Sequence, residues 1–264
     1  MPTSAASEGS AFLGVSLKMY LDHHSTLRWI ADVAAIADEQ PAVLDGRVRL
    51  AVLPTFVSLQ AAARIMVGSP LALGAQDLSW AESGAYTGEV SGRDLAELGC
   101  RYVEVGHAER RRLFGEDDKI ISGKLAAAQR NGLIPILCVG EEDREESDQA
   151  ADFCLNQVAG ALAEIDGSDP EAAGLPELII AYEPVWAIGA DRPAGVDHVQ
   201  AVCRRLRAGV ADDHRLQRVR VIYGGSAGPG LLSDLGDAVD GLFLGRFAHD
   251  PDQLRRVIIE AAAR

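Results

Sequence analysis

Several features that mark common functional classes are missing from this sequence. Its four cysteines show no CxxC spacing, and its six histidines form no HxH or HxxxH pair, so neither a disulfide framework nor a metal site is indicated. No apolar run approaches the roughly 18–20 residues of a membrane-spanning helix. Single thiols of this kind are typical of a reducing compartment, and we therefore expect a cytoplasmic protein without a metal.

Basic residues are also scarce. Lys and Arg number 25 against 39 Asp and Glu, which gives a formal net charge of −14. This balance argues against a nucleic-acid partner, because such a partner is bound by a basic stripe. It does not exclude a small anionic substrate, since local backbone donors rather than net charge make a phosphate site.

The sequence has a large apolar fraction and begins with a short polar segment. Hydrophobic residues make up 48% of the chain, which is typical of a globular core. Residues 1–10 (MPTSAASEGS) are small and polar and show no signal peptide, so they predict a flexible N-terminal tail. Residues 11–264 are predicted to form a single domain.

Strand-like apolar runs alternate with amphipathic helical patterns along the whole chain. Helical spacing is clear in 146–165, in 195–210 and after Asp250-Pro251, an N-cap followed by a proline suited to the first helical turn. Eight such βα units predict a single (β/α)8 barrel, an α/β fold. A doubly wound open sheet is the alternative, weakened by the missing GxGxxG after the first run. The predicted strands are 11–16, 48–52, 71–75, 101–105, 133–139, 178–182, 219–223 and 240–244.

Polar residues follow several of these strands, and in a barrel they would converge on one mouth. Glu183 follows the sixth strand and Lys18 the first. His107 follows the fourth strand, with Glu109 two residues later. A short helical turn beginning there would point its positive end at the imidazole and favour its neutral form. Each residue alone could be a surface or structural side chain, so the prediction depends on their convergence.

Glycine-rich segments follow the seventh and eighth strands. Residues 224–230 (GGSAGPG) and 244–250 (LGRFAHD) predict an anion nest of backbone N–H groups, at a place where barrels often bind phosphate. Together with a carboxylate, a neutral imidazole and a lysine, this nest suits proton abstraction α to a carbonyl in a phosphorylated substrate. The long loop 76–91, which carries Trp80 and Tyr86, suggests a partner subunit that covers these rings.

These segments closely resemble the triosephosphate isomerase family, in its order and spacing and over nearly the whole chain. The resemblance implies a cofactor-independent aldose–ketose isomerase of small phosphosugars that acts through an enediol(ate). It also implies a homodimer formed through the 76–91 loop and a place in glycolysis and gluconeogenesis. The matching segments are AQDLSWAESGAYTGEVS, EVGHAERRRLFGED, CVGE, AYEPVWAIG, YGGS and DGLFLG.

The same resemblance implies a role for each site residue. Glu183 would move the proton between adjacent carbons, His107 would polarise the carbonyl, and Lys18 would supply electrostatic stabilisation. The loop 184–194 would close over the substrate as a lid. The phosphate would bind the backbone N–H groups of Gly189, Ser226, Gly245 and Arg246, and the supporting residues would be Glu109, Trp186 and Tyr223.

Four features depart from the family pattern. Ser16 stands where the family has an asparagine that reaches the substrate, and Ala108 replaces a serine that can hold the resting base. The lid end 190–194 reads ADRPA, and Arg246 replaces a glycine. The loop with Trp80, the Gly245-Arg246 pair and the Pro193-Ala194 end of the lid resemble a divergent branch of the family. That branch includes isomerases of erythrulose phosphates used in tetritol breakdown, and the shorter Ser16 would leave room for one more hydroxylated carbon.

The sequence therefore favours interconversion of glyceraldehyde 3-phosphate and dihydroxyacetone phosphate. The alternative is interconversion of L-erythrulose 1-phosphate and D-erythrulose 4-phosphate by the same chemistry. A non-catalytic phosphosugar-binding paralogue would require the loss of Glu183 or His107. A barrel glycosidase with Glu109 and Glu183 as its paired carboxylates would not need the phosphate nest.

Overall fold

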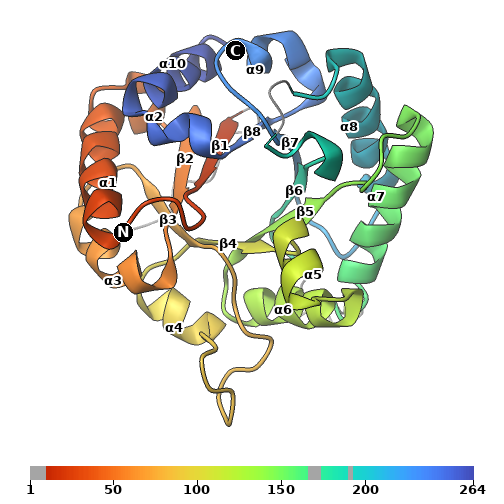
Figure 1. The fold of residues 1–264 in the computed structure, drawn as a ribbon, viewed down its shortest axis with the longest axis horizontal. Coiled ribbons are helices and arrows are strands. Elements are labelled where there is room, and N and C mark those ends of the chain that lie inside the picture. The colour runs from red at the N-terminus through yellow and green to blue at the C-terminus, as the bar shows by residue number, and fades with distance from the viewer. Residues whose placement is uncertain (1–9, 166–173, 190–192) are drawn as a thin grey trace.

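Eight parallel strands close into a barrel at the centre of the computed structural model, with helices arranged around it (Figure 1). The structure describes residues 10–165, 174–189 and 193–264. The first strand pairs with both the second and the eighth, which closes the sheet. The strands are β1 (Ala11–Ser16), β2 (Val48–Leu53), β3 (Ala72–Ala75), β4 (Tyr102–Val105), β5 (Ile134–Val139), β6 (Leu178–Tyr182), β7 (Val219–Gly224) and β8 (Gly241–Leu244).

Helices connect successive strands, and three short ones follow β4, β6 and β8 directly, at the carboxyl ends of these strands. The helices are α1 (His23–Asp38), α2 (Pro41–Leu44), α3 (Phe56–Ile65), α4 (Gly92–Glu97), α5 (Ala108–Phe114), α6 (Asp118–Arg130), α7 (Ser147–Ala161), η1 (Val185–Ala187), α8 (Val196–Val210), α9 (Leu231–Leu235), η2 (Gly236–Ala238), η3 (Arg246–His249) and α10 (Pro251–Ala262).

The barrel prediction is confirmed, and each predicted strand matches an observed one to within a residue at either end. The last helix begins as expected, because the Asp250 carboxylate accepts a hydrogen bond from the N–H of Asp252 and Pro251 occupies the first turn. The helical pattern predicted for 146–165 extends beyond the observed helix, because α7 ends at Ala161.

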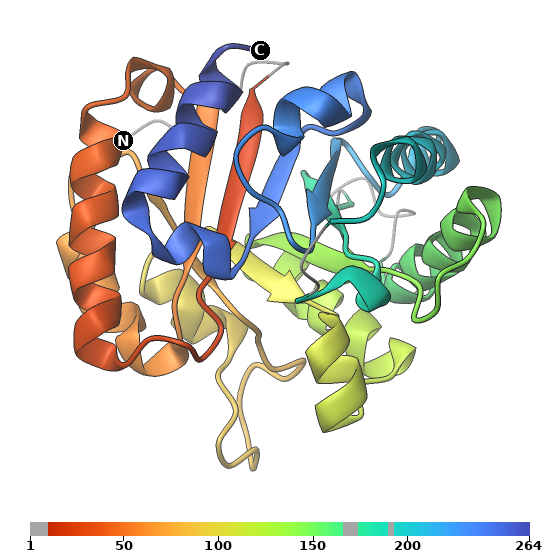
Figure 2. The same ribbon diagram turned by 45° about the horizontal axis from the view of Figure 1, so that its top comes forward.

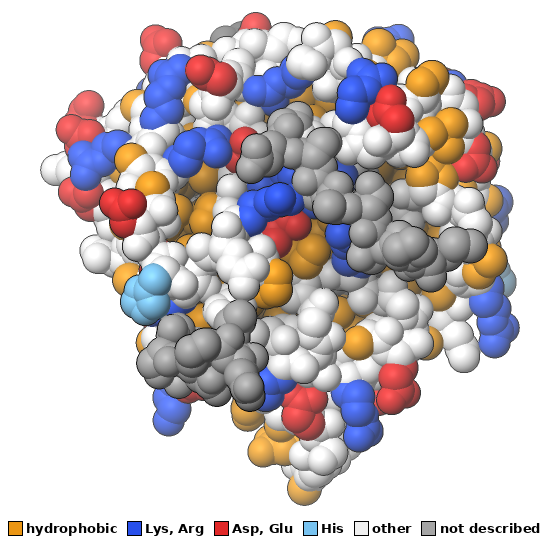
Figure 3. All heavy atoms as spheres, turned by 180° about the vertical axis from the view of Figure 1, so that it is seen from behind, with side chains coloured by type: hydrophobic (Ala, Val, Ile, Leu, Met, Phe, Trp, Pro, Cys, Tyr) orange, Lys and Arg blue, Asp and Glu red, His pale blue; other side chains and the backbone are white. Residues whose placement is uncertain are grey.

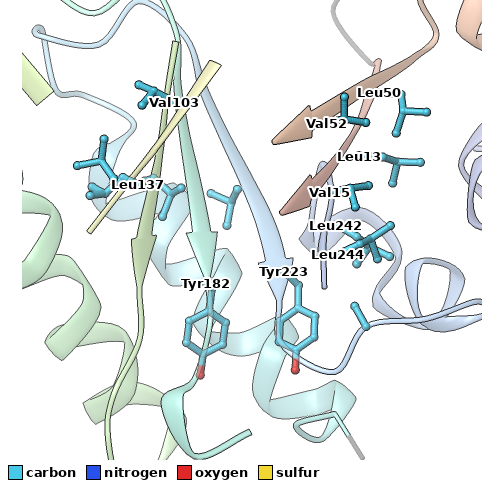
Figure 4. Close-up of a cluster of buried hydrophobic side chains, with 14 of the residues drawn as sticks. Leu13, Val15, Leu50, Val52, Val103, Leu137, Tyr182, Tyr223, Leu242 and Leu244 are labelled. Carbon is cyan, nitrogen blue, oxygen red and sulfur yellow. The ribbon is translucent and has the colours of Figure 1, made fainter. Parts of the chain in front are cut away.

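Alternating side chains of the strands build two apolar layers. One layer fills the barrel interior and includes Phe12, Tyr102 and Ile136. The other lies between the strands and the surrounding helices, and Figure 4 shows part of it, including Leu13 and Val103. Because successive residues of a strand point to opposite faces, the parity of a residue decides which layer it enters.

An ion-pair cluster lies near the amino ends of the strands, at the opposite end of the barrel from the predicted mouth. Glu177 pairs with Arg220 at 2.7 Å and with Arg49 at 3.2 Å. Arg220 also donates hydrogen bonds to the carbonyl and the hydroxyl oxygen of Ser10. Ser10 is therefore buried and anchors the start of β1, whereas residues 1–9 of the predicted tail lie outside the described residues.

The 76–91 loop projects away from the barrel in two views of the molecule (Figures 1 and 2). Trp80 and Tyr86 lie edge to face, 5.9 Å apart, and are 40% and 44% exposed. The base of the loop is held firmly, because the buried Asp77 pairs with the Lys124 ammonium at 2.6 Å. The loop is thus fixed at its base while its aromatic side chains face solvent.

Charged side chains of both signs are interspersed on the face seen in Figure 3. Within the described part of the chain, no helix has both the length and the apolar character needed to cross a bilayer.

Candidate active site

The Glu183 side chain lies at the carboxyl end of β6, where two glycines make room for it. Its backbone N–H donates to the Val139 carbonyl at 2.8 Å, which fixes the end of the strand against β5. A Cβ on Gly140 would lie 2.0 Å from the Glu183 carbonyl oxygen, and a Cβ on Gly224 would lie 2.4 Å from the Glu183 side chain. These close approaches explain why CVGE and YGGS carry glycine at these positions.

Glu183 faces His107 across the mouth of the barrel. Glu183 is 7% exposed, and its Oε2 lies 3.4 Å from Nε2 of His107. Among the described residues, this oxygen has no hydrogen-bond partner. A buried carboxylate oxygen without a partner is costly to keep, so the arrangement suits a group that a substrate completes.

The short helix that the sequence predicted after β4 is α5, and His107 is its N-cap. Its Nδ1 accepts the backbone N–H of Glu109 at 3.0 Å. A ring nitrogen that accepts a hydrogen bond carries no proton, so the proton of the imidazole lies on Nε2, the nitrogen that faces Glu183. His107 can therefore donate a hydrogen bond into the mouth without first gaining a charge.

Lys18 is held in an unusual backbone conformation. With φ of 47° it is the sole non-glycine residue with positive φ in the described part of the chain. Such strain is typical of a functional site. Its Nζ contacts Glu109 Oε1 at 2.8 Å. Burial acts to lower the pKa of Lys18, but this hydrogen bond and the charges of Glu183, Glu109 and Glu104 outweigh it and raise the pKa. The lysine is therefore a permanent cation at the mouth.

A cavity of about 660 Å³ lies over the glycine-rich turns and takes in the predicted phosphate residues Gly189, Ser226, Gly245 and Arg246. The Arg246 guanidinium lies 5.6 Å from the centre of the Tyr20 ring, at the rim of this cavity. The backbone N–H groups of such turns, together with these side chains, can hold a phosphate dianion.

A second, smaller cavity of about 30 Å³ joins this cradle to the catalytic candidates. Ser16, His107 and Glu183 line it, and it shares Lys18 and Gly245 with the larger cavity. Because the two cavities share walls, a small phosphorylated substrate can place its phosphate in the cradle with its carbon chain directed toward Glu183 and His107.

The start of the predicted lid is anchored by Glu141 and Tyr182, two buried side chains that the sequence alone does not reveal. The indole Nε1 of Trp186, in η1, donates to Glu141 Oε1 at 2.8 Å, and the Tyr182 hydroxyl donates to the same oxygen at 3.0 Å. Glu141 follows β5 in the CVGE segment, to which the sequence alone gives no role.

The far end of the lid contacts Tyr223. The N–H of Ala194 donates to the Tyr223 hydroxyl at 3.2 Å. Burial raises the pKa of Tyr223 to about 12, so the hydroxyl stays neutral. Figure 4 shows Tyr182 and Tyr223 side by side on β6 and β7, with both hydroxyls pointing beyond the ends of their strands. The divergent residues 190–192 lie outside the described residues.

Two further positions bear on the departures from the family pattern. Ala108 and Glu183 line one cavity of about 390 Å³, so the missing serine hydroxyl would have faced this space. Ser16 donates its hydroxyl hydrogen to Glu104 Oε2 at 2.8 Å. The sequence did not single out Glu104, an acid in the middle of a buried strand. It lies two residues after Tyr102, which points into the barrel, so the alternation of side chains along the strand places Glu104 on the same face.

The assembled groups define a narrow range of chemistry. Within the described residues, no group of three His, Cys, Asp or Glu side chains could hold a metal ion. A carboxylate, an imidazole N–H and an ammonium converge beside a phosphate cradle. This arrangement suits removal of a proton from a carbon next to a carbonyl while the carbonyl oxygen gains negative charge.

Comparison with known proteins agrees with this geometry. A sequence model of the triosephosphate isomerase family matches residues 11–262. The chain is 51% identical to L-erythrulose-1-phosphate isomerase of Pectobacterium atrosepticum, over 94% of this chain and 95% of that protein. It is 41% identical to triosephosphate isomerase of Mycobacteroides abscessus, over 93% and 94%, and 38% identical to that of Streptomyces avermitilis, over 91% and 93%. The chain therefore belongs to the triosephosphate isomerase family and is an isomerase of the aldose–ketose type.

Proposed function

We propose that this chain interconverts L-erythrulose 1-phosphate and D-erythrulose 4-phosphate. On three carbons the family reaction joins an aldose and a ketose, whereas on four carbons the same proton transfer joins two ketoses. The observation that carries the proposal is the short Ser16, which lines the small cavity together with Glu183 and His107 and occupies less of it than the asparagine of the family pattern would. The 51% identity to a protein of this name, against 38–41% for triosephosphate isomerases, supports the choice.

The proposed mechanism begins with the phosphate held by the backbone of Gly189, Ser226, Gly245 and Arg246. Glu183 removes the proton from C3 of L-erythrulose 1-phosphate, and the electron pair moves to give a C2–C3 enediolate. The same carboxylic acid then returns the proton to C2, and the carbonyl forms at C3. The phosphate and the carbon skeleton are unchanged, and no other reactant is consumed.

His107 and Lys18 act on the oxygens in this scheme. The Nε2–H of His107 donates to the carbonyl oxygen and moves a proton between the two oxygens of the enediolate. The Lys18 ammonium, held by Glu109, stabilises the negative charge that develops there. Such groups are effective because they are fixed before the reaction begins and are shielded from water.

The loop 184–194 closes over the substrate in this proposal. Trp186 bound to Glu141 fixes its start, and Tyr223 holds Ala194 near its end. Closure excludes water from the enediolate and keeps the phosphate in its cradle.

The second candidate substrate pair is glyceraldehyde 3-phosphate and dihydroxyacetone phosphate. It is favoured by the complete set of Glu183, His107 and Lys18 in a chain that is 41% identical to a triosephosphate isomerase. The presence of the base and the imidazole at 3.4 Å speaks against a non-catalytic paralogue.

Steady-state assays with purified protein and both substrate pairs test the choice. We expect kcat/KM for L-erythrulose 1-phosphate to exceed that for glyceraldehyde 3-phosphate by at least about 100-fold, the scale at which a site built for one substrate rejects a smaller analogue. The reverse ratio would show that the protein is a triosephosphate isomerase in function as well as in family.

We also propose a homodimer formed through the 76–91 loop, with Thr87 and Glu89 in contact with the neighbouring subunit. The exposed Trp80 and Tyr86 on a loop with a rigid base support this arrangement.

The cytoplasm is the proposed location, because all four cysteines are buried free thiols. Tetritol breakdown is the matching pathway for the four-carbon substrate, and glycolysis and gluconeogenesis for the three-carbon one.

A further inference from the structure

A buried acid lies directly beneath the catalytic candidates. Glu104 belongs to β4 and shares the inward face of this strand with Tyr102, so its side chain enters the barrel interior. It is 3% exposed. Its Oε2 accepts the Ser16 hydroxyl at 2.8 Å, and its Oε1 lies 4.0 Å from Nε2 of His107.

Fold stability does not account for this carboxyl group. Three other buried acids of the described chain have lysine or arginine partners: Asp77 and Glu116 share the Lys124 ammonium, and Glu177 is held by two arginines. The buried Glu141 has no such partner in the described part of the chain but accepts hydrogen bonds from Trp186 and Tyr182. Within the described residues, Glu104 has no lysine or arginine nitrogen within 4.0 Å. A buried carboxylate without a cationic partner destabilises a fold, so its position indicates a role in the site.

The surroundings of Glu104 set its charge. Burial raises the pKa of Glu104 to about 7; His107, the Ser16 hydroxyl and Lys18 act against the rise, and Glu183 adds to it. The Cys138 thiol of β5 also lies in this interior layer, and burial raises its pKa well above the usual value, so it stays neutral. Glu104 therefore changes charge close to neutral pH, and is ionised above it.

An ionised Glu104 determines what Ser16 can offer a substrate. A carboxylate only accepts hydrogen bonds, so the single hydroxyl hydrogen of Ser16 is used by Glu104. The remaining lone pairs of Ser16 Oγ can accept a hydrogen bond from a group in the small cavity. Ser16 lines that cavity but not the phosphate cradle, so it lies at the substrate end away from the phosphate.

We propose that Glu104 is a positioning residue that holds Ser16 as the hydrogen-bond acceptor for the terminal hydroxyl of a four-carbon substrate. The inference rests on the proposed function, because a three-carbon substrate ends at the reacting carbon and lacks this extra hydroxymethyl group. Ser16 and Glu104 then act as one unit that recognises the length of the substrate.

A double-mutant cycle tests the unit. The variants are Ser16→Ala, Glu104→Leu and both together, and the readout is kcat/KM for L-erythrulose 1-phosphate divided by kcat/KM for glyceraldehyde 3-phosphate, at pH 8. Each single change should lower this ratio about 10-fold, mainly through KM, as expected for one lost hydrogen bond to substrate. The double variant should fall no more than about 2-fold further, because both changes remove the same interaction.

Glu104→Gln provides a second test, because this substitution keeps the shape of the side chain and removes its titratable group. The wild-type ratio should rise as pH increases from 6 to 8, as Glu104 ionises and fixes Ser16. The ratio should be flat with pH in Glu104→Gln, since the amide does not titrate. Tyr102→Phe, on the same strand and the same inward face, serves as the control and should keep the wild-type ratio and pH profile.

Three results would overturn the inference: an unchanged ratio in Glu104→Leu, additive losses in the double variant, or a pH-dependent ratio that persists in Glu104→Gln. A wild-type enzyme that prefers glyceraldehyde 3-phosphate would instead overturn the proposed function, and with it the substrate that the inference assumes. The wild-type assay alone therefore separates the two failures.

Discussion

At the scale of single residues, the site is a set of charges held at short distances by backbone geometry. Glu183 lies between two glycines, and His107 presents one defined ring nitrogen because its other nitrogen caps a helix. Lys18 is strained and bound to Glu109. A change of less than an ångström at any of these positions alters which atoms the substrate meets, so conservative substitutions are informative.

We expect Glu183→Asp and His107→Gln each to lower kcat by roughly 2–4 decades, the usual contribution of a positioned acid or base. The aspartate withdraws the carboxylate from the substrate carbon, and the glutamine lacks the ring N–H that points at the carbonyl. Steady-state kinetics with the preferred substrate measures the loss. Matched controls are Glu97→Asp and His214→Gln, both on the exposed surface; near-normal activity in either active-site variant would refute its role.

The raised pKa of Glu104 makes a separate prediction about stability. Its folded pKa of about 7 lies above the usual 4.5, so the folded state binds the proton more tightly than the unfolded state. This group therefore lowers the free energy of unfolding as pH rises from about 4.5 to 7, by up to about 3 kcal/mol. Urea unfolding of wild type and Glu104→Gln at pH 5 and pH 8 should show the variant gaining relative stability at pH 8. An equal difference at both pH values would contradict the pKa shift.

At the scale of elements, the proposed lid has two anchors that come from different strands. Trp186 at its start binds Glu141, which follows β5, and Ala194 near its end binds Tyr223 of β7. The described ends of the 184–194 loop are therefore tied to both neighbours of β6, the strand that carries Glu183. The proposed closure of this loop would thus be linked to the surroundings of Glu183.

Tyr223→Phe should weaken the closed lid. It removes the acceptor for the Ala194 N–H and leaves a buried donor without a partner, at a cost of about 1–3 kcal/mol in the closed form. We expect kcat/KM to fall about 10-fold, and more inorganic phosphate to be released per turnover, because water reaches the enediolate. Tyr102→Phe, which removes a hydroxyl inside the barrel, is the control. Unchanged phosphate release in Tyr223→Phe would indicate that Tyr223 does not hold the lid.

At the scale of the whole molecule, the 76–91 loop projects from the barrel (Figures 1 and 2). Its base is fixed through Asp77 and Lys124, so the loop is presented as a rigid element (Figure 2). Two aromatic rings remain exposed on it. A loop of this kind is stabilised when a second subunit covers the rings, as in the proposed dimer.

Thr87→Arg should break this dimer, because it places a bulky cation where the neighbouring subunit is expected. Sedimentation equilibrium at micromolar concentration should show wild type at twice the chain mass and the variant at the chain mass, with circular dichroism unchanged. Gln217→Arg adds the same charge at an exposed position elsewhere and should remain dimeric. A monomeric wild type would contradict the proposal.

The amino-acid sequence by itself determined the barrel and predicted which side chains gather at its mouth. Eight apolar runs separated by amphipathic helices allow few other folds, and the first polar residue after a buried strand marks the mouth. Only the tertiary structure decided which distant side chains meet, such as Ser16 with Glu104 or Trp186 with Glu141. These pairs lie 88 and 45 residues apart, and their contact depends on the closure of the barrel and the parity of each strand, which no local pattern specifies.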